Sequence, residues 1–362
     1  MMTIRQELMP LQETRKEVDH QPKVVAASLE TNHSDITALA NEIVKKGIDK
    51  IYLAGSGDSM FAGLCVKEAF QSYARIPLEV IQAYEYAAFG QEGVDGRSAI
   101  IVVSSSGRIS TTRNALDRAL KSPGLVIGIT DRAAEDNPFY SEPDYKLVPG
   151  AIKDGWPTQT TTATIALLID LAIQIGKSKA VISNSQAGES FEDLNRVLQQ
   201  MSIVLDESSE PMLQVAHKVI DAKTICFVGS GPGYGVANVG AALMAEGPQR
   251  VGLPLYVEEF HHSLRINTLD LGMPLFLIAP RDQAYQRYLD TAQAVKNWGG
   301  YLIAIVTEGD EQIASMANTV VQIPDVPVPM HSLLTMLPLH QFSIALTECR
   351  VARGYERPWY QV

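Results

Sequence analysis

The chain has 362 residues, of which 46% are hydrophobic, so it exceeds one typical domain and can bury two substantial cores. Its 41 acidic residues outnumber its 30 basic ones, and the net charge of −11 excludes a nucleic-acid surface spread over the whole molecule, because such binding relies on lysine and arginine. The net charge does not argue against a local basic patch.

The cysteines and the apolar runs bear on the compartment. Cys65, Cys226 and Cys349 are odd in number and far apart, which is typical of reduced core thiols rather than of disulfides or a zinc site. The N-terminal segment carries charges where a signal peptide needs an apolar core, and the best apolar run, 163–172, is short and interrupted by Asp170. We therefore expect a soluble cytoplasmic protein without a membrane partner.

Two stretches of the chain repeat one pattern. "KIYLAGSGDSMFAGLCVKEAF" in the first half corresponds to "TICFVGSGPGYGVANVGAALMAE" in the second, and their Gly-Ser-Gly turns are 174 residues apart. The order continues with "AIIVVSSSG" against "PLFLIAPRD". The sequence therefore predicts one domain used twice.

Each copy alternates short apolar runs with helical segments of about ten to fifteen residues, which is typical of a parallel sheet covered on both faces. The predicted strands are residues 51–54, 78–82, 99–103, 124–129, 145–147, 224–228, 255–258, 274–278, 301–306 and 320–323. We therefore predict an α/β fold of two tandem domains, each a parallel five-stranded sheet between two helical layers.

The same pattern predicts four regions. They are a helical arm (1–48), a first domain (49–182), a helical linker (183–210) and a second domain with its C-terminal tail (211–362).

The first strand leads into "GSGDSMFAG", residues 55–63. The spacing is not G-x-G-x-x-G, no acidic residue ends a second strand about 20 residues later, and no Gly-Lys-Ser/Thr follows, so neither a dinucleotide site nor a P-loop is predicted. We interpret the stretch as a tight turn from strand to helix, with Ser56 and Ser59 facing the carboxyl edge of the sheet. A purely structural turn is the alternative.

The third strand runs into "VVSSSGRISTT", residues 102–112, which we call the serine loop. Ligands of parallel sheets bind at this edge, where helix N-termini offer free N–H groups and small hydroxyl groups add donors without blocking an anion. The loop supplies the hydroxyl groups of Ser104, Ser105, Ser106, Ser110, Thr111 and Thr112. We predict a phosphate site, with simple helix capping as the alternative. Arg108 either strengthens anion binding or points into solvent.

The second copy has "APRDQAY" in place of the serine loop, which indicates that its function differs from that of the first copy. Its first helix, predicted to begin after Gly235, carries an apolar stripe, and Glu246 falls at the next position of that stripe near the helix end. Partial burial and the helix dipole would raise the pKa of this carboxyl group, which suits general acid/base catalysis. A glutamate that reaches solvent is the alternative.

"EEFHH", residues 258–262, ends at His262, which is sixteen residues after Glu246. Adjacent residues of an extended chain point in opposite directions, and no H-x-H or H-x-x-x-H spacing is present, so no metal site is predicted. Two interpretations stay open, a catalytic histidine beside an acid and a hydrogen-bonded structural one. The sequence assigns no role to His261.

Together these motifs resemble the sugar isomerase (SIS) family of phosphosugar-binding proteins. The doubled sheet domain, the serine loop and a helix glutamate followed sixteen residues later by the last histidine of "EFHH" carry the resemblance, which covers nearly the whole chain, including "KEVDHQP". The chain is similar to the isomerase half of glucosamine-6-phosphate synthase and to the fructosamine-6-phosphate deglycases.

The resemblance implies roles for particular residues. The family's phosphate-binding positions fall on Ser59, Ser104, Ser105, Ser106 and Thr158. The synthase has a threonine where this chain has Ile109, so Ser110 or Thr111 would supply that contact. Glu246 matches the proton-transferring glutamate and His262 the histidine linked to ring opening. Because that histidine can come from a second subunit, a homodimer or larger homo-oligomer with the active site near the subunit interface is implied.

Two departures from the synthase narrow the expected activity. The chain begins Met-Met-Thr without a glutaminase half, so no glutaminase activity is expected, and no lysine follows Lys296 where the synthase tail carries one for the sugar carbonyl. The resemblance therefore implies a deglycase that moves a proton between C1 and C2 of a 1-amino-1-deoxy-ketose 6-phosphate, such as fructosamine 6-phosphate. Hydrolysis of the imine gives an aldose 6-phosphate and an amine, with no metal or organic cofactor.

Other activities remain open. They are an aldose–ketose isomerase, a deaminase of an amino-sugar phosphate, and a sugar-phosphate sensor without enzymatic activity.

Overall fold

The computed structural model describes residues 9–90, 92–264 and 272–355, which form two compact units. The first-repeat unit consists of Gln21–Ile152 and Gln159–Leu198; the second-repeat unit takes the described residues of Met1–His20, Lys153–Thr158 and Gln199–Val362. The first-repeat unit is thus interrupted by residues 153–158, which belong to the second-repeat unit. The N-terminal Met-Met-Thr and the C-terminal "ERPWYQV" lie outside the described residues.

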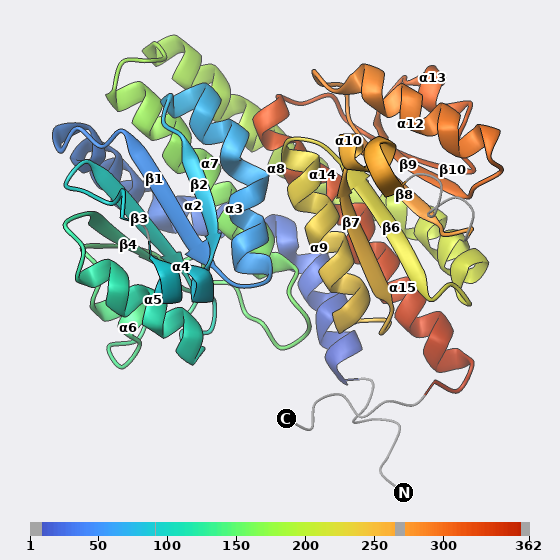
Figure 1. Ribbon diagram of the computed structural model, residues 1–362, viewed down its shortest axis with the longest axis horizontal. Coiled ribbons are helices and arrows are strands. Elements are labelled where there is room, and N and C mark those ends of the chain that lie inside the picture. Colours follow the sequence, from blue (N-terminus) through green and yellow to red (C-terminus); the bar gives the residue numbers. More distant parts are fainter. Residues whose placement is uncertain (1–8, 91, 265–271, 356–362) are drawn as a thin grey trace, which may run out of the picture. The chain divides into compact units, whose positions relative to one another are not determined.

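The first-repeat unit contains a parallel sheet of five strands in the order β2-β1-β3-β4-β5 (Figure 1). The strands are β1 (Lys50–Gly55), β2 (Leu78–Gln82), β3 (Ser98–Val103), β4 (Leu125–Ile129) and β5 (Tyr145–Leu147). The chain leaves β1 toward β2 on one side and returns to β3 on the other, so the winding direction reverses between β1 and β3. Ligands of open α/β sheets bind beyond the carboxyl ends of the strands at such a switch point.

Helices cover both faces of this sheet. Gly63 of α3 lies against Leu53, so close that a Cβ would come within 2.8 Å of that side chain, and α7 packs beside α3. On the other face, Tyr52 and Ile100 pack in a buried cluster with side chains of α4, α5 and α6. The helices are α3 (Asp58–Ala69), α4 (Ala83–Phe89), α5 (Ser110–Leu120), α6 (Pro138–Ser141) and α7 (Gln159–Ser178), with a π-helical turn at Phe70–Ala74.

Two long helices, α2 (Met9–Lys45) and α8 (Asn184–Val219), contribute residues to both units. The predicted arm corresponds to α2, and the predicted linker is the first part of α8. Within the described ranges, no helix combines the length and the apolar character that crossing a bilayer requires.

The second-repeat unit repeats the topology, with the order β10-β9-β8-β6-β7. Its strands are β6 (Thr224–Gly229), β7 (Val251–Tyr256), β8 (Leu275–Ala279), β9 (Leu302–Thr307) and β10 (Thr319–Ile323). Its helices are α9 (Pro232–Glu246), α10 (Val257–Glu259), α12 (Tyr285–Asn297), α13 (Glu311–Ala314), α14 (His331–Thr335) and α15 (Leu337–Ala352), with a π-helical turn at Phe260–Leu264 and a 3-10 turn at Val328–Met330. The predicted α/β fold with two five-stranded parallel sheets is confirmed.

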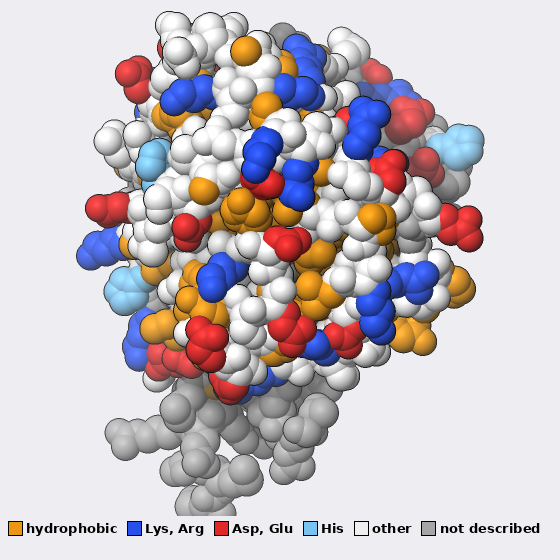
Figure 2. Space-filling view, turned by 90° about the vertical axis from the view of Figure 1, so that its left-hand side faces the viewer, with side chains coloured by type: hydrophobic (Ala, Val, Ile, Leu, Met, Phe, Trp, Pro, Cys, Tyr) orange, Lys and Arg blue, Asp and Glu red, His pale blue; other side chains and the backbone are white. Residues whose placement is uncertain are grey.

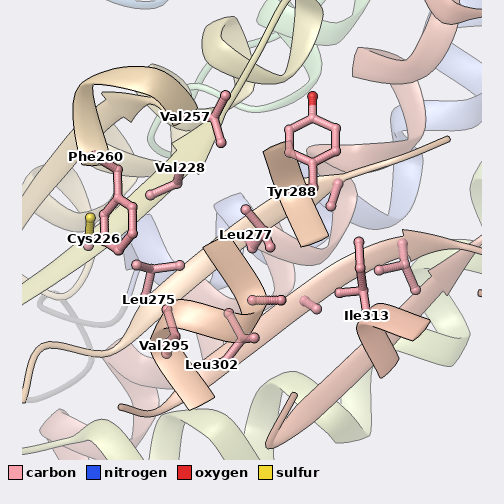
Figure 3. Close-up of a cluster of buried hydrophobic side chains, with 14 of the residues drawn as sticks. Cys226, Val228, Val257, Phe260, Leu275, Leu277, Tyr288, Val295, Leu302 and Ile313 are labelled. Carbon is pink, nitrogen blue, oxygen red and sulfur yellow. The ribbon is translucent and has the colours of Figure 1, made fainter. Parts of the chain in front are cut away.

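The second sheet buries side chains on both faces. Cys226 and Val228 point to the face covered by α12, in the cluster of Figure 3, and Tyr288 of α12 packs there. Phe227, between them in the chain, points the other way and stacks on Phe276, with 5.2 Å between ring centroids. Burial on both faces explains why these strands read as unbroken apolar runs. The cysteines Cys65, Cys226 and Cys349 are buried and free, as predicted.

Two element boundaries in the second repeat differ from the prediction. β7 runs from Val251 to Tyr256 and ends before Glu258 and Glu259, whereas the sequence predicts a strand over 255–258. β7 pairs with β6 alone, and such an edge strand tolerates Gly252 and Pro254. Helix α9 begins at Pro232 rather than after Gly235, because proline suits a first helical position.

The face shown in Figure 2 carries charged side chains of both signs. Lysine and arginine are interspersed with aspartate and glutamate, and apolar areas lie between them. This face therefore presents no broad basic surface for nucleic acid.

Candidate active site

The turn after β1 requires glycine at two positions. Gly57 has φ +55°, and a Cβ on Gly55 would lie 2.8 Å from the backbone nitrogen of Met60. Ser56 Oγ accepts a hydrogen bond of 3.1 Å from Gln82 Nε2 at the end of β2. Ser59 lies half-buried in the first turn of α3. The predicted tight turn thus holds both serines at the carboxyl edge of the sheet.

Backbone hydrogen bonds tie the serine loop to the end of β4. Ser104 N–H donates to the carbonyl oxygen of Ile129 at 2.9 Å, and Ser105 O accepts from Asp131 N–H at 3.1 Å. Gly107 has φ +65°, and its N–H donates to Ser104 O at 3.2 Å. The chain therefore turns back sharply before α5 begins, and the loop has a fixed shape.

The first-repeat unit brings most of the predicted phosphate-binding residues to one edge. Strands β1 and β3 are neighbours, with Ala54 opposite Val102, so the residues after them lie at the same switch point. Those residues are Ser56, Ser59, Ser104, Ser105, Ser106 and Thr111. The first turn of α5 contains no acidic residue, so its free N–H groups and the hydroxyl groups suit an anion. Arg108 is exposed beside them.

Thr158 belongs instead to the second-repeat unit, and α7 begins at the next residue. The segment before it is anchored by Glu17 of "KEVDHQP", whose Oε1 accepts hydrogen bonds from Asp154 N–H (2.6 Å) and Gly155 N–H (2.9 Å). Trp156 N–H donates to Thr14 Oγ1 at 3.1 Å. We did not predict this anchoring role of Glu17 from the sequence, in which only the acidic motif "KEVDHQP" points to it.

Glu246 is the last residue of α9 and lies half-buried beside that segment. A Cβ on the next residue, Gly247, would lie 3.1 Å from both the Trp156 ring and Thr347 Oγ1. The buried Arg350 of α15 donates hydrogen bonds to the carbonyl oxygens of Pro248 and Gln249, the second at 3.3 Å. The turn that carries Glu246 is therefore fixed by contacts within its own unit.

The two histidines have different surroundings. His261 is half-buried, and its Nε2 lies 2.8 Å from Thr291 Oγ1. His262 is exposed in the π-helical turn. The neighbouring Glu258 is bound through both oxygens by Arg287, at 2.7 and 3.0 Å, which lowers the pKa of that carboxyl group.

Glu246 and His262 lie at opposite ends of β7. Arg250 N–H donates to Met244 O at 2.7 Å, so the end of α9 adjoins the start of β7, whereas His262 follows the strand's carboxyl end. Six strand residues span about 20 Å, which is too far for both side chains of one chain to reach the same sugar carbons. They can share one substrate only if His262 comes from a second copy.

The switch point of the second-repeat unit has different chemistry. Asp282 Oδ1 accepts from Ala284 N–H at 2.7 Å, and its Oδ2 accepts from Tyr288 OH at 3.1 Å. Tyr234 and Tyr256 stack with 3.4 Å between ring centroids. A carboxylate and an aromatic pair thus lie at this edge, where Ser230 corresponds to Ser56 and Gly233 takes the position of Ser59.

Comparison with known proteins agrees with the internal repeat. The SIS domain family matches residues 42–169 and 218–345. Glutamine–fructose-6-phosphate aminotransferase (isomerizing) from Leifsonia xyli subsp. xyli is 25% identical over 352 residues, which cover 94% of this chain and 56% of that protein. The chain spans about half the length of the curated relatives it matches.

Solved structures share the fold. The C-terminal domain of glucosamine-fructose-6-phosphate aminotransferase from Francisella tularensis has a TM-score of 0.84 at 22% identity, covering 93% of this chain and 96% of that one. Glucosamine-6-phosphate deaminase from Thermotoga maritima has a TM-score of 0.72 at 17% identity, covering 94% and 95%. The chain therefore belongs to the SIS domain family, with two SIS domains in tandem, and is homologous to the isomerase domain of glucosamine-fructose-6-phosphate aminotransferase.

Proposed function

We propose that this protein is a phosphosugar deglycase that acts on a 1-amino-1-deoxy-ketose 6-phosphate of the fructosamine 6-phosphate type. Two observations, one in each repeat, carry the proposal: a hydroxyl-lined switch point in the first and a glutamate on a fixed turn in the second. The relatives named above are an isomerizing aminotransferase and an amino-sugar-phosphate deaminase, which supports an amino-sugar phosphate as substrate.

The phosphate of the substrate binds at the serine loop in this proposal. Backbone bonds to the end of β4 hold Ser104 through its N–H and Ser105 through its carbonyl oxygen, so the two hydroxyl groups and the N–H of Ser105 need little reorganisation when the anion arrives. Ser59 and Thr111 extend the donor set from the first turns of α3 and α5. Thr158 adds a contact from the segment anchored by Glu17.

Glu246 transfers the proton between C1 and C2. A carboxylate suits this step because the proton is alpha to a carbonyl or imine carbon, and a well-placed general base contributes about 10²–10⁴ in rate. His262 of a second subunit assists ring opening, which is consistent with its exposure and its separation from Glu246. Water then hydrolyses the C1 imine to an aldose 6-phosphate and a free amine.

The decisive experiment is a substrate panel on the purified full chain. Fructose-amine 6-phosphates with and without an amino-acid substituent are incubated with the protein, and glucose 6-phosphate is followed with a coupled dehydrogenase. Glucosamine 6-phosphate is assayed in parallel for ammonia release. We expect turnover of the fructose-amine adducts, and preferential turnover of glucosamine 6-phosphate would instead indicate a deaminase.

Variants separate catalysis from binding. Glu246→Gln should abolish turnover and retain thermal stabilisation by sugar phosphates, whereas Glu207→Gln, an exposed glutamate of the same unit, should leave turnover unchanged. Stabilisation of the unmodified protein by sugar phosphates without turnover of any substrate would contradict the enzyme and favour a sensor.

A further inference from the structure

A cavity of about 500 Å³ opens among helices α2, α7 and α8 within the first-repeat unit. Its size lies in the range of small-molecule sites. Its walls are mainly apolar, from Leu29, Phe191, Leu194 and Leu198. None of its lining residues belongs to the serine loop or to the turn after β1, so it is a separate feature of the fold.

Asp170 of α7 lines this cavity and is only 3% exposed. It interrupts a helix that is otherwise almost entirely buried and rich in apolar side chains. Within the described part of the chain, its Oδ1 accepts no hydrogen bond. A buried carboxylate oxygen without a hydrogen bond is costly, so Oδ1 is poised to accept one from a donor outside the chain.

The other polar side chains that line the cavity favour a ligand with a positive charge. Glu30, His33 and Asn195 line the same cavity, and no lysine or arginine does. Burial raises the pKa of Asp170 to about 6, with the nearby His33 acting in the opposite direction, so the carboxyl group is ionised at pH 7.5. Two carboxylates and an amide oxygen thus meet the ligand, and hydrocarbon walls surround its remainder.

We propose that this cavity binds a small molecule with a protonated amino group on a short apolar body. The ammonium group donates to Asp170, and the hydrocarbon packs against Leu29, Phe191 and Leu194. This proposal does not depend on phosphosugar chemistry, because no residue assigned to the reaction lines the cavity. It assigns a role to Asp170, which the proposed reaction does not use.

Calorimetric titration of the full chain with two isosteric probes tests the charge requirement. At pH 7.5, 2-phenylethylamine should bind at least about tenfold more tightly than 2-phenylethanol, because a hydrogen bond to a charged group adds a preference of that order. Asp170→Asn should remove this preference. Glu30→Gln should weaken amine binding, and Asp35→Asn, an exposed acid of α2 outside the cavity, should not.

Two further measurements keep the proposal falsifiable even if Asp170→Asn perturbs folding. Ala26→Trp, at an exposed lining position, should block the cavity and abolish binding of the amine. Lowering the pH from 7.5 to 5.5 should weaken binding about fourfold, because only about a quarter of a group with pKa 6 stays ionised. His33 and Glu30 are the other titratable side chains that line the cavity.

Equal affinity for the amine and the alcohol would overturn the proposal. Unchanged amine binding by Ala26→Trp would also overturn it, as would an equal loss of amine affinity in Asp35→Asn and Glu30→Gln. The same holds if the titration shows no saturable heat at millimolar amine.

Discussion

Glu246 and His262 flank the same strand, one before the first residue of β7 and the other after its last. If both serve one reaction, each active site combines residues of two subunits. Separately purified Glu246→Gln and His262→Ala variants should then be inactive, and a mixture unfolded and refolded together should regain about a quarter of the normal activity, since half the dimers carry one intact site.

The rate of product release is measured at several mixing ratios of the two variants, and each variant refolded alone is the control. Activity that stays at the level of the single variants after mixed dimers are verified would contradict an active site shared between subunits.

Arg350 should act as a positioning residue for Glu246. It is 7% exposed and donates to the carbonyl oxygens of the turn after Glu246. Arg350→Met should lower the free energy of unfolding by about 1–3 kcal/mol, because buried acceptors lose their donor. It should also lower kcat more than it raises KM, since the serine loop, where we propose that the phosphate binds, belongs to the other unit.

The matched control is Arg353→Met, three residues along the chain. Arg353 makes an exposed ion pair with Asp221, which is worth less than about 1 kcal/mol, so kcat should be unchanged. If Arg350→Met lowers stability but leaves kcat as high as in Arg353→Met, Arg350 has a purely structural role.

The internal repeat supplies a matched pair of glycines. Gly57 and Gly231 have nearly the same backbone angles, φ +55° and +51°, and no atom lies within 4 Å of a Cβ built on either. Alanine at either position should therefore cost a similar amount through backbone strain, about 1–3 kcal/mol.

Only Gly57→Ala should affect the ligand. Serine precedes both glycines, but Ser59 follows Gly57, whereas Gly233 takes that position in the second repeat. We expect a higher KM for the phosphosugar with Gly57→Ala and an unchanged KM with Gly231→Ala. Similar KM values for the two variants would argue against phosphate binding at the turn after β1.

Most strands were predictable from the sequence because both faces of each sheet are buried. The apolar run "AIIVV" lies within β3, and β2 and β5 have the predicted bounds. Periodicity carries little information for β7, where Val251 is 62% exposed and only one neighbour pairs with the strand.

Local sequence pattern also explains which features of the candidate site were predicted and which were not. Local pattern located the hydroxyl groups after β1 and β3, since strand order brings such ends together. The hydrogen bonds of Glu17 to residues 154 and 155 bridge 137 and 138 positions, and nothing in local periodicity indicates such a contact.

Asp170 should make stability depend on pH. Burial raises its pKa in the folded state to about 6 from 3.8, so the folded protein holds this proton more tightly than the unfolded chain does. The group therefore costs no stability below pH 3.8, and its cost grows as the pH rises through 6. At pH 7.5 the cost approaches about 3 kcal/mol.

Asp170→Asn keeps the shape and removes the charge. The variant should be more stable than the unmodified protein at pH 7.5 by about 1–3 kcal/mol, less whatever the buried amide costs, and the difference should shrink at pH 4.5. Urea unfolding at both pH values measures it, with Asp35→Asn as the exposed control. A variant that is less stable at pH 7.5 would mean that the carboxylate has a partner, and the cavity would then lose its reason to attract a cation.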